Sequence, residues 1–405
     1  MATIAPFRAL RPAPDAAARV AAVPYDVVSS EEAQALAAGN PLSFLHVSRA
    51  EIDLAPGTNP YADAVYAKAV ENFSSLKAKA PLVMEDRPSL YVYRLRMGGH
   101  VQTGIAASFW MDEYDADVIK KHEKTRRDKE DDRTRHMLEL RAQTGPVFLT
   151  YTASPAVDAV VERTAARPPL FDFTAADGVR HTIWRVDATD DRALVAAFGA
   201  IPALYIADGH HRAASAARVR QQLRGANGAK GEWDTFLAVA FPDTQVQVLP
   251  YNRVVKDLGS HTPASLLAAI KERTTVKDGP ATPARKGDAA MFLDGRWHTI
   301  DLGQPPSGVT PADRLDVSRL HELVLAPLLG IGDVRVDKRI DFVGGARGTT
   351  ELEKLVRGGK AAVAFSMYPV GVDDLMIISD AGGIMPPKST WFEPKLRDGL
   401  LSHLI

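Results

Sequence analysis

The chain has 405 residues, of which 46% are hydrophobic and 24% charged, and its formal net charge is −1. This composition is typical of a globular protein with two or three domains, and the balanced charge argues against a nucleic-acid or membrane-surface binder. The chain has no cysteine, which excludes a disulfide framework, a Cys-ligated metal and a thiol nucleophile. No apolar run approaches the roughly 20 residues of a membrane span, and no signal peptide is evident. We therefore expect a cytoplasmic protein without a membrane partner.

The first part of the chain, residues 1–108, shows mixed helix and strand patterns. Ser29 and Glu32 have the spacing of a capping box, which predicts a helix over residues 30–38. Residues 43–47 (Ser-Phe-Leu-His-Val) predict a strand, and helical spacing predicts a helix over residues 61–78. The Gly98-Gly99 pair between two β-rich runs predicts a hairpin of residues 90–97 and 102–110.

Residues 112–141 carry the densest charge in the chain. Thr125 and Asp128 fit a second capping box, so a helix is expected to begin just after Glu123. Most of its charges are expected on a solvated face. Glu123 differs because it lies at the junction of loop and helix, where its carboxylate is a candidate general base. Two pairs within the helix have the spacing of surface ion pairs: Glu130 with Arg133, and Asp131 with Arg135.

Residues 203–217 combine a short apolar strand, a glycine corner and the start of an alanine-rich helix. Asp208 takes the N-cap position, where its carboxylate could accept from amides two and three residues further on. The start of a helix presents unpaired N–H groups and the positive end of the helix dipole, which favours an anion. An equally weighted interpretation is a capped helix whose histidines face solvent. The basic side chains of the first turn are His210, His211 and Arg212.

The sequence changes character near residue 251. Residues 263–272 and 318–329 have helical patterns, and Asp294-Gly295 predicts a hairpin of residues 289–293 and 297–302. We expect a loop at the glycine-rich residues 342–348 and a strand at residues 376–379.

Several catalytic motifs are absent. The chain lacks G-x-x-x-x-G-K-[ST], so any nucleotide site is not of the P-loop type. It also lacks G-x-S-x-G and H-E-x-x-H, since His122-Glu123 is followed by Lys124 and Arg126 where zinc would need a ligand. A dinucleotide oxidoreductase or a hydrolase therefore has no positive support.

The motif Asp208-Gly-His-His-Arg212 resembles the phosphate-binding corner of the ParB/sulfiredoxin superfamily. Gly209 and Arg212 match both branches, while His210 occupies the cysteine position of the sulfiredoxins, whose chemistry is therefore excluded. Residues 118–123 look like the strand and its exit that precede the corner in that superfamily. The resemblance implies an α+β fold of mixed sheets with helices. Its core would span residues 109–250, flanked by N-terminal (1–108) and C-terminal (251–405) α/β regions.

A glutamate combined with this corner is similar to free-serine kinases built on the same fold. The resemblance implies ATP or another nucleotide as the phosphate donor and Mg²⁺ as a cofactor, with Glu123 as the base that takes the hydroxyl proton. Asp208 would hold Mg²⁺ or cap the helix, and His210 would join the catalytic set. The residues implied for phosphate or nucleotide contacts are Gly209, His211, Arg212, His122, Arg126 and Arg133.

Over nearly its full length the chain resembles a bacterial family known as domain of unknown function 1015. The hypothesis drawn from the residues and both resemblances is a kinase acting on a small hydroxylated metabolite, with free L-serine foremost. The alternative is a nucleotide-binding switch or ligand sensor of the ParB type without turnover. Whether the chain forms a homo-oligomer stays open. The matching stretches are residues 23–28, 44–47, 122–125, 129–133, 208–212, 339–345 and 385–391.

Overall fold

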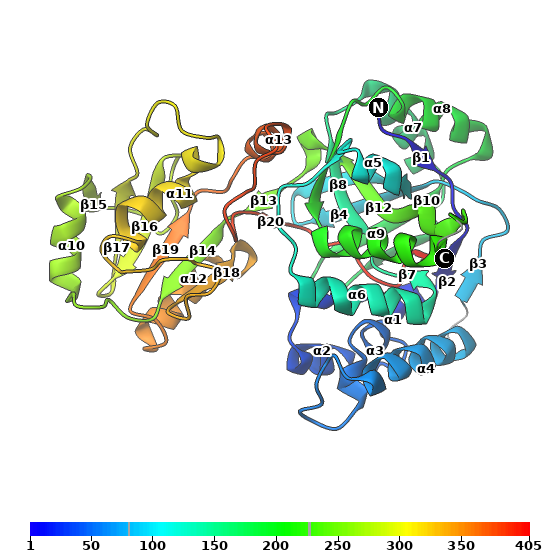
Figure 1. Cartoon of the computed structure of the whole chain (residues 1–405), viewed down its shortest axis with the longest axis horizontal. Coiled ribbons are helices and arrows are strands. Elements are labelled where there is room, and N and C mark those ends of the chain that lie inside the picture. The colour runs from blue at the N-terminus through cyan, green and yellow to red at the C-terminus, as the bar shows by residue number, and fades with distance from the viewer. Residues whose placement is uncertain (80–81, 226–227) are drawn as a thin grey trace. The chain divides into compact units, whose positions relative to one another are not determined.

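The computed structural model of the chain describes residues 1–79, 82–225 and 228–405. It has the mixed α+β fold that the sequence predicts, with several sheets and interspersed helices (Figure 1). The chain forms two compact units, residues 1–246 with 394–405, and residues 247–393. The finer division into regions 1–108, 109–250 and 251–405, and the ParB/sulfiredoxin-like core, stay predictions.

The first unit contains a nine-stranded sheet in the order β6-β11-β8-β12-β5-β4-β10-β9, with β1 paired to β5. Strand β11 runs parallel to β6 and antiparallel to β8, and β8 runs parallel to β12. Its strands are β1 (Ile4–Ala5), β4 (Tyr91–Met97), β5 (His100–Trp110), β6 (Ile119–Lys120), β8 (Val147–Tyr151), β9 (Phe171–Thr174), β10 (Arg180–Arg185), β11 (Leu204–Asp208) and β12 (Thr235–Pro242).

One hydrophobic core joins this sheet to helices α5 to α9. Ala213, Ala216 and Val219 on α9 and Val157 and Val160 on α7 belong to it, together with sheet residues such as Leu149 and Ile206. Helices α6 and α9 lie side by side (Figure 1). The helices are α5 (Met111–Asp115), α6 (Arg127–Leu140), α7 (Pro155–Ala165), α8 (Ala188–Phe198) and α9 (His210–Arg224).

A second core of the first unit lies under a four-stranded sheet, β3-β2-β21-β7. Phe44 and Phe73 meet edge to face in it, with ring centroids 6.2 Å apart. Its elements are β2 (Ala9–Pro12), β3 (Leu82–Met84), β7 (Ala142–Gln143), β21 (Ser402–Leu404), α1 (Ala17–Val20), α2 (Ser30–Ala37), α3 (Leu45–Ser48) and α4 (Asp63–Lys79).

The second unit has an antiparallel six-stranded sheet, β15-β17-β16-β19-β14-β18, and a separate pair, β13-β20. Its core is apolar and includes Phe365, Met291 and Leu320. The strands are β13 (Val248–Leu249), β14 (Tyr251–Val255), β15 (Val276–Asp278), β16 (Asp288–Leu293), β17 (Arg296–Asp301), β18 (Ile340–Gly344), β19 (Val363–Met367) and β20 (Trp391–Phe392). The helices are α10 (Pro263–Lys271), α11 (Asp316–Leu320), α12 (Gly348–Arg357) and α13 (Val372–Asp380).

Several element predictions are confirmed. The amide of Glu32 donates to Ser29 Oγ and the amide of Ser29 donates to Glu32 Oε2, so the capping box of α2 forms. Helices α4 and α10 form where helical spacing predicts them. The predicted hairpins form as β4–β5 and β16–β17.

Three element predictions are wrong. Residues 43–47 and 376–379 do not form strands: residues 45–47 lie in helix α3 and residues 376–379 in helix α13, because short segments rich in apolar residues do not distinguish a buried helix from a strand. Residues 342–348 begin in β18 rather than in a loop, since that segment pairs with β14. The helix expected over residues 318–329 is confirmed in part, because α11 continues into a π-helical turn at His321–Leu325 and the helical backbone ends there.

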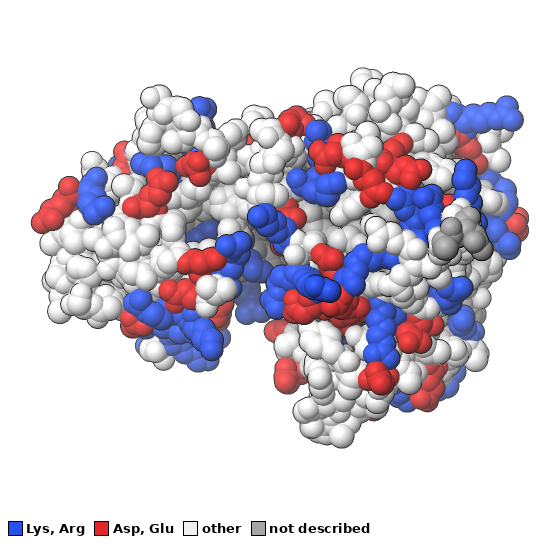
Figure 2. Space-filling view, in the orientation of Figure 1, with Lys and Arg blue, Asp and Glu red and all other residues white. Residues whose placement is uncertain are grey.

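Acidic and basic side chains intermingle on the face of the molecule shown in Figure 2, in keeping with the net charge of −1. Within the described ranges, no helix is long and apolar enough to cross a membrane.

Candidate functional site

The corner predicted from residues 203–217 forms where strand β11 passes into helix α9. Asp208 is the last residue of β11, Gly209 has φ +93°, and α9 begins at His210. Gly209 therefore takes the N-cap position, and the prediction that Asp208 caps the helix is wrong. The left-handed backbone at Gly209 leaves Asp208 one residue too early to reach the helix amides. Among the described residues no side chain caps α9, so its first N–H groups have neither an intrahelical acceptor nor a cap there.

The Asp208 carboxylate instead contacts two cations. Its Oδ2 lies 3.4 Å from Lys395 Nζ and 3.4 Å from Arg212 Nη2. Burial raises the pKa of Asp208, but Lys395 and Arg212 outweigh it, so the pKa lies well below the usual value. The corner therefore carries an ionised carboxylate at neutral pH.

Arg212 lies beneath the corner instead of pointing into solvent. It is 4% exposed, and its guanidinium donates to the carbonyl of Pro146. A Cβ at residue 209 would lie 3.0 Å from Arg212 Cζ and Nε, so only glycine leaves this space to the guanidinium. Nε of Arg212 is buried and has no hydrogen-bond partner in the described part of the chain. The structure places Arg212 where its charge acts on Asp208, while a direct phosphate contact stays a prediction.

The loop between β6 and α6 brings Glu123 to the start of α9. The backbone N–H of His122 points at His210 Nε2, 3.4 Å away, and the two imidazole rings meet edge to face with centroids 4.3 Å apart. A nitrogen that accepts from a backbone N–H carries no proton in a neutral imidazole, so the proton of His210 resides on Nδ1. That Nδ1 lies 3.7 Å from Glu123 Oε2. His210 thus directs an N–H toward the Glu123 carboxylate.

Burial keeps both of these histidines neutral. It lowers the pKa of His122 to about 4, and it lowers the pKa of His210 well below the ordinary value, with His122 acting in the same direction. Glu123, in contrast, has a side chain that is 58% exposed. The arrangement is a neutral, buried histidine pair that supports an accessible carboxylate.

His211 points away from His210, as expected for neighbours on a helix. Its Nε2 accepts from the backbone N–H of Arg126 at 3.0 Å, which ties the start of α6 to the start of α9. The Arg126 side chain is 70% exposed and pairs with Asp128. The predicted capping box of Thr125 with Asp128 does not form, because the Thr125 hydroxyl donates to Glu130 and Arg126 takes the N-cap position.

Arg133 is not a surface residue. Its side chain is 11% exposed, it pairs with Asp132 at 2.8 Å, and its guanidinium lies 4.1 Å from the centre of the Tyr25 ring. The predicted ion pairs Glu130–Arg133 and Asp131–Arg135 are therefore wrong. Arg218 on α9 contacts Glu130 and Asp131, and Arg135 contacts Asp63 and Glu139.

The sequence reasoning missed two residues near the corner, Lys395 and Asp398. Lys395 pairs with Asp208, although the two lie 187 residues apart in the chain. Asp398 is 3% exposed, and burial raises the pKa of its carboxyl to about 7, although the nearby Arg212 lowers it. Pairs so distant in sequence leave no local pattern, and only the match at residues 385–391 pointed toward this end of the chain.

Within the described ranges, no group of three or more His, Asp or Glu side chains could hold a metal ion. Mg²⁺ in phosphoryl-transfer sites needs only one or two carboxylates, with phosphates and water as its other ligands. The ionised Asp208 carboxylate suits that limited role. Asp208 as a Mg²⁺ ligand stays a prediction.

Comparison with known proteins gives one family match and several remote structural likenesses. A free serine kinase in complex with AMP is 14% identical, with a TM-score of 0.36, and the match covers 73% of this chain and 92% of that chain. SbnI from Staphylococcus aureus, truncated at its C-terminus, is 12% identical, with a TM-score of 0.40 over 74% of this chain and 87% of that chain. No curated protein matches the sequence. Residues 4–318 match one family, and the chain therefore belongs to the family described as "Protein of unknown function (DUF1015)".

Proposed function

We propose that the protein is an ATP-dependent phosphotransferase acting on a small hydroxylated metabolite, with free L-serine as the first substrate to test. The observation that carries this proposal is the position of Glu123. Its accessible carboxylate lies 3.7 Å from the proton-bearing nitrogen of His210, at the uncapped start of α9. A carboxylate beside an anion-binding helix start is the pairing that transfer of a phosphoryl group to a hydroxyl requires.

The phosphate end of the site is the first turn of α9. The amides of His210, His211 and Arg212 lack intrahelical acceptors, and the positive end of the helix dipole adds to their attraction for phosphate. Lys395 and Arg212, both next to Asp208, add positive charge at the same corner. When bound, Mg²⁺ supplies charge neutralisation on the phosphates, and Asp208 is the residue that would hold it.

The acceptor end is Glu123. As the hydroxyl oxygen forms its bond to the γ-phosphorus and the bond to the ADP oxygen breaks, the hydroxyl proton passes to the Glu123 carboxylate. The neutral His210 orients that carboxylate through its Nδ1–H and keeps it from turning away. Nδ1 of His210 already carries a proton and cannot accept a second one, so Glu123 rather than His210 is the base.

The test is incubation of the protein with ATP, Mg²⁺ and a pool of hydroxylated amino acids and sugars that includes L-serine, read by mass spectrometry. We expect a phosphorylated product, O-phosphoserine first. Glu123→Gln should lower turnover by about 100-fold or more while ATP binding persists. Glu139→Gln removes a carboxylate on helix α6 that is 47% exposed and lies outside the corner; it is the matched control and should retain full turnover.

Two outcomes would overturn parts of this proposal. Unchanged turnover in Glu123→Gln would remove Glu123 as the base. ATP binding with no product from any acceptor would reject the kinase and favour the nucleotide-binding switch.

A further inference from the structure

A groove far from the corner is lined by arginines. It has a volume of about 250 Å³ and lies over the β4–β10 edge region of the large sheet, beside the end of α7. One carboxylate, Asp172, lies among the described residues that line it. The arginines are Arg94, Arg96, Arg167 and Arg180, and the other lining residues are Ala165, Pro169, Thr182 and Trp184.

Strand pairing concentrates these charges. Arg94 and Arg96 lie two residues apart on β4, so both side chains stand on the same face of the sheet. Arg96 is directly opposite Arg180 on β10, and Arg94 is opposite Thr182. Like charges placed directly across a strand pair destabilise a sheet unless something neutralises them.

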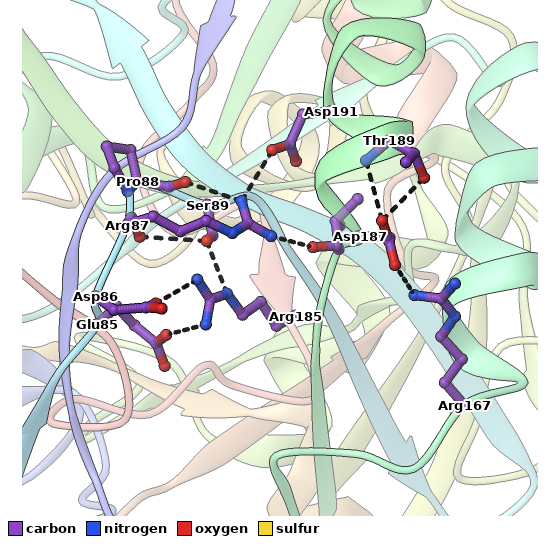
Figure 3. Close-up of polar contacts among 11 residues, drawn as sticks. Glu85, Asp86, Arg87, Pro88, Ser89, Arg167, Arg185, Asp187, Thr189 and Asp191 are labelled. Atoms are coloured by element: carbon purple, nitrogen blue, oxygen red, sulfur yellow. Dashed lines mark hydrogen bonds and ion pairs between the residues drawn. The ribbon is translucent and has the colours of Figure 1, made fainter.

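Two of the four arginines already have carboxylate partners. Arg180 forms a bidentate pair with Asp172, with contacts of 2.5 and 2.7 Å. Arg167 points to the carboxylate of Asp187, which also accepts from Thr189 (Figure 3). These pairs hold the rim of the groove in place.

Arg94 and Arg96 have no carboxylate partner among the described residues. The Nε of Arg94 donates to Thr103 Oγ1 at 3.0 Å, and its guanidinium lies 5.0 Å from the centre of the Trp184 ring. Burial and the neighbouring Arg96 both lower the pKa of Arg94. Arg94 is therefore held in a fixed position by neutral contacts, with its charge uncompensated, and Arg96 lies beside it.

We propose that this groove binds a small phosphorylated metabolite, with the phosphoryl dianion between Arg94 and Arg96. A dianion matches the two uncompensated charges, and guanidinium groups bind phosphate through paired N–H donors. Thr182, across from Arg94, donates its hydroxyl to Asp172 at 3.1 Å and so helps to hold that carboxylate on Arg180. The groove is large enough for a phosphate with a few attached carbons.

This site is separate from the β11–α9 corner. Strands β8, β12 and β5 lie between β11 and β4 in the sheet, which corresponds to roughly 19 Å at the usual strand spacing. The inference does not depend on the proposed kinase activity, and a metabolite bound here would be an effector rather than the reacting phosphate.

Calorimetric titration of the full chain with inorganic pyrophosphate tests the proposal, with succinate as a dianion that lacks phosphorus. We expect saturable pyrophosphate binding that Arg96→Gln weakens by about tenfold or more, and that Arg94→Gln with Arg96→Gln abolishes at this site. The control is Arg163→Gln on α7, which removes an arginine that is 56% exposed, pairs with Asp190 and lies outside the groove. This variant should bind pyrophosphate as the unaltered chain does.

Pyrophosphate that binds at the β11–α9 corner would still bind there in the Arg96→Gln variant and in the double variant. Loss of one of two binding steps in the titration therefore identifies the groove. Arg96 is exposed, so its variant should unfold at the same urea concentration as the unaltered chain. Pyrophosphate binding that is identical in the double variant, or absent from the unaltered chain, would overturn the proposal. Equal binding of succinate would overturn the choice of phosphate.

Discussion

Asp398 should make the protein less stable as the pH rises toward neutrality. Its carboxyl is buried, and its Oδ1 has no hydrogen-bond partner among the residues that the structure describes. It faces Gly145, where a Cβ would lie 2.7 Å from that oxygen. Burial raises the pKa of Asp398 from 3.8 to about 7, even though Arg212 lowers it.

The sign follows from proton binding. Between pH 3.8 and about 7 the folded chain keeps a proton on Asp398 that the unfolded chain releases, so the free energy of unfolding falls as the pH rises. The full shift corresponds to about 4 kcal/mol, reached at and above about pH 7. Below pH 3.8, the pKa of Asp398 in the unfolded chain, both the folded and the unfolded state carry the proton, and Asp398 no longer makes the free energy of unfolding depend on pH.

Asp398→Asn removes this titration. Urea unfolding of both proteins from about pH 4 to about pH 8 should show the variant gaining stability over the unaltered chain by up to about 4 kcal/mol. The Asn side chain also adds a buried amide, which shifts the difference by a constant at every pH and leaves its slope intact. Asp15→Asn, an exposed control, should follow the unaltered chain. A difference that stays constant across this pH range would refute the reasoning.

Two further changes test the corner and the buried histidines. Gly209→Ala should destabilise the protein by about 1–3 kcal/mol in urea unfolding, because φ is +93° and the new Cβ would press on Arg212. Gly178 has a similar φ of +81°, but a Cβ there would meet no atom of the described residues within 4 Å, so Gly178→Ala is the control. An equal loss of stability in Gly178→Ala would show that the contact with Arg212 contributes nothing. Burial lowers the pKa of His136 to about 4, so stability should fall as the pH drops from about 6.5 toward 4, by up to roughly 3 kcal/mol. His136→Gln should flatten that decline, and an unchanged acid limb of the pH–stability curve would contradict the assignment.

Local signals predicted the parts of this fold that depend on near neighbours. The Ser29–Glu32 capping box, the Gly98-Gly99 turn and the strand–glycine–helix corner each lie within a few residues, and each forms. The position of Gly209 was harder, because Asp208 has the side chain that usually caps a helix. The left-handed glycine moves the helix start past it.

The charged helix α6 shows what local patterns leave out. Spacing alone paired Arg133 with Glu130, yet Arg133 is buried beside Tyr25, because a segment about 100 residues earlier in the chain covers that face of the helix. The contact of Asp208 with Lys395 has the same character. Charge pairs formed across the fold depend on which elements become neighbours, and no periodicity encodes that.

The return of residues 394–405 to the first unit has a consequence for synthesis on the ribosome. Lys395, Asp398 and strand β21 all follow the second unit in the chain, so they emerge only after residues 247–393 have been translated. Until then, β2 and β7 lack the strand that lies between them, and the carboxylate of Asp208 lacks its lysine. The nascent first unit is therefore unfinished while the second unit is made. Premature termination within the second unit would leave a first unit that lacks both strand β21 and the lysine that pairs with Asp208.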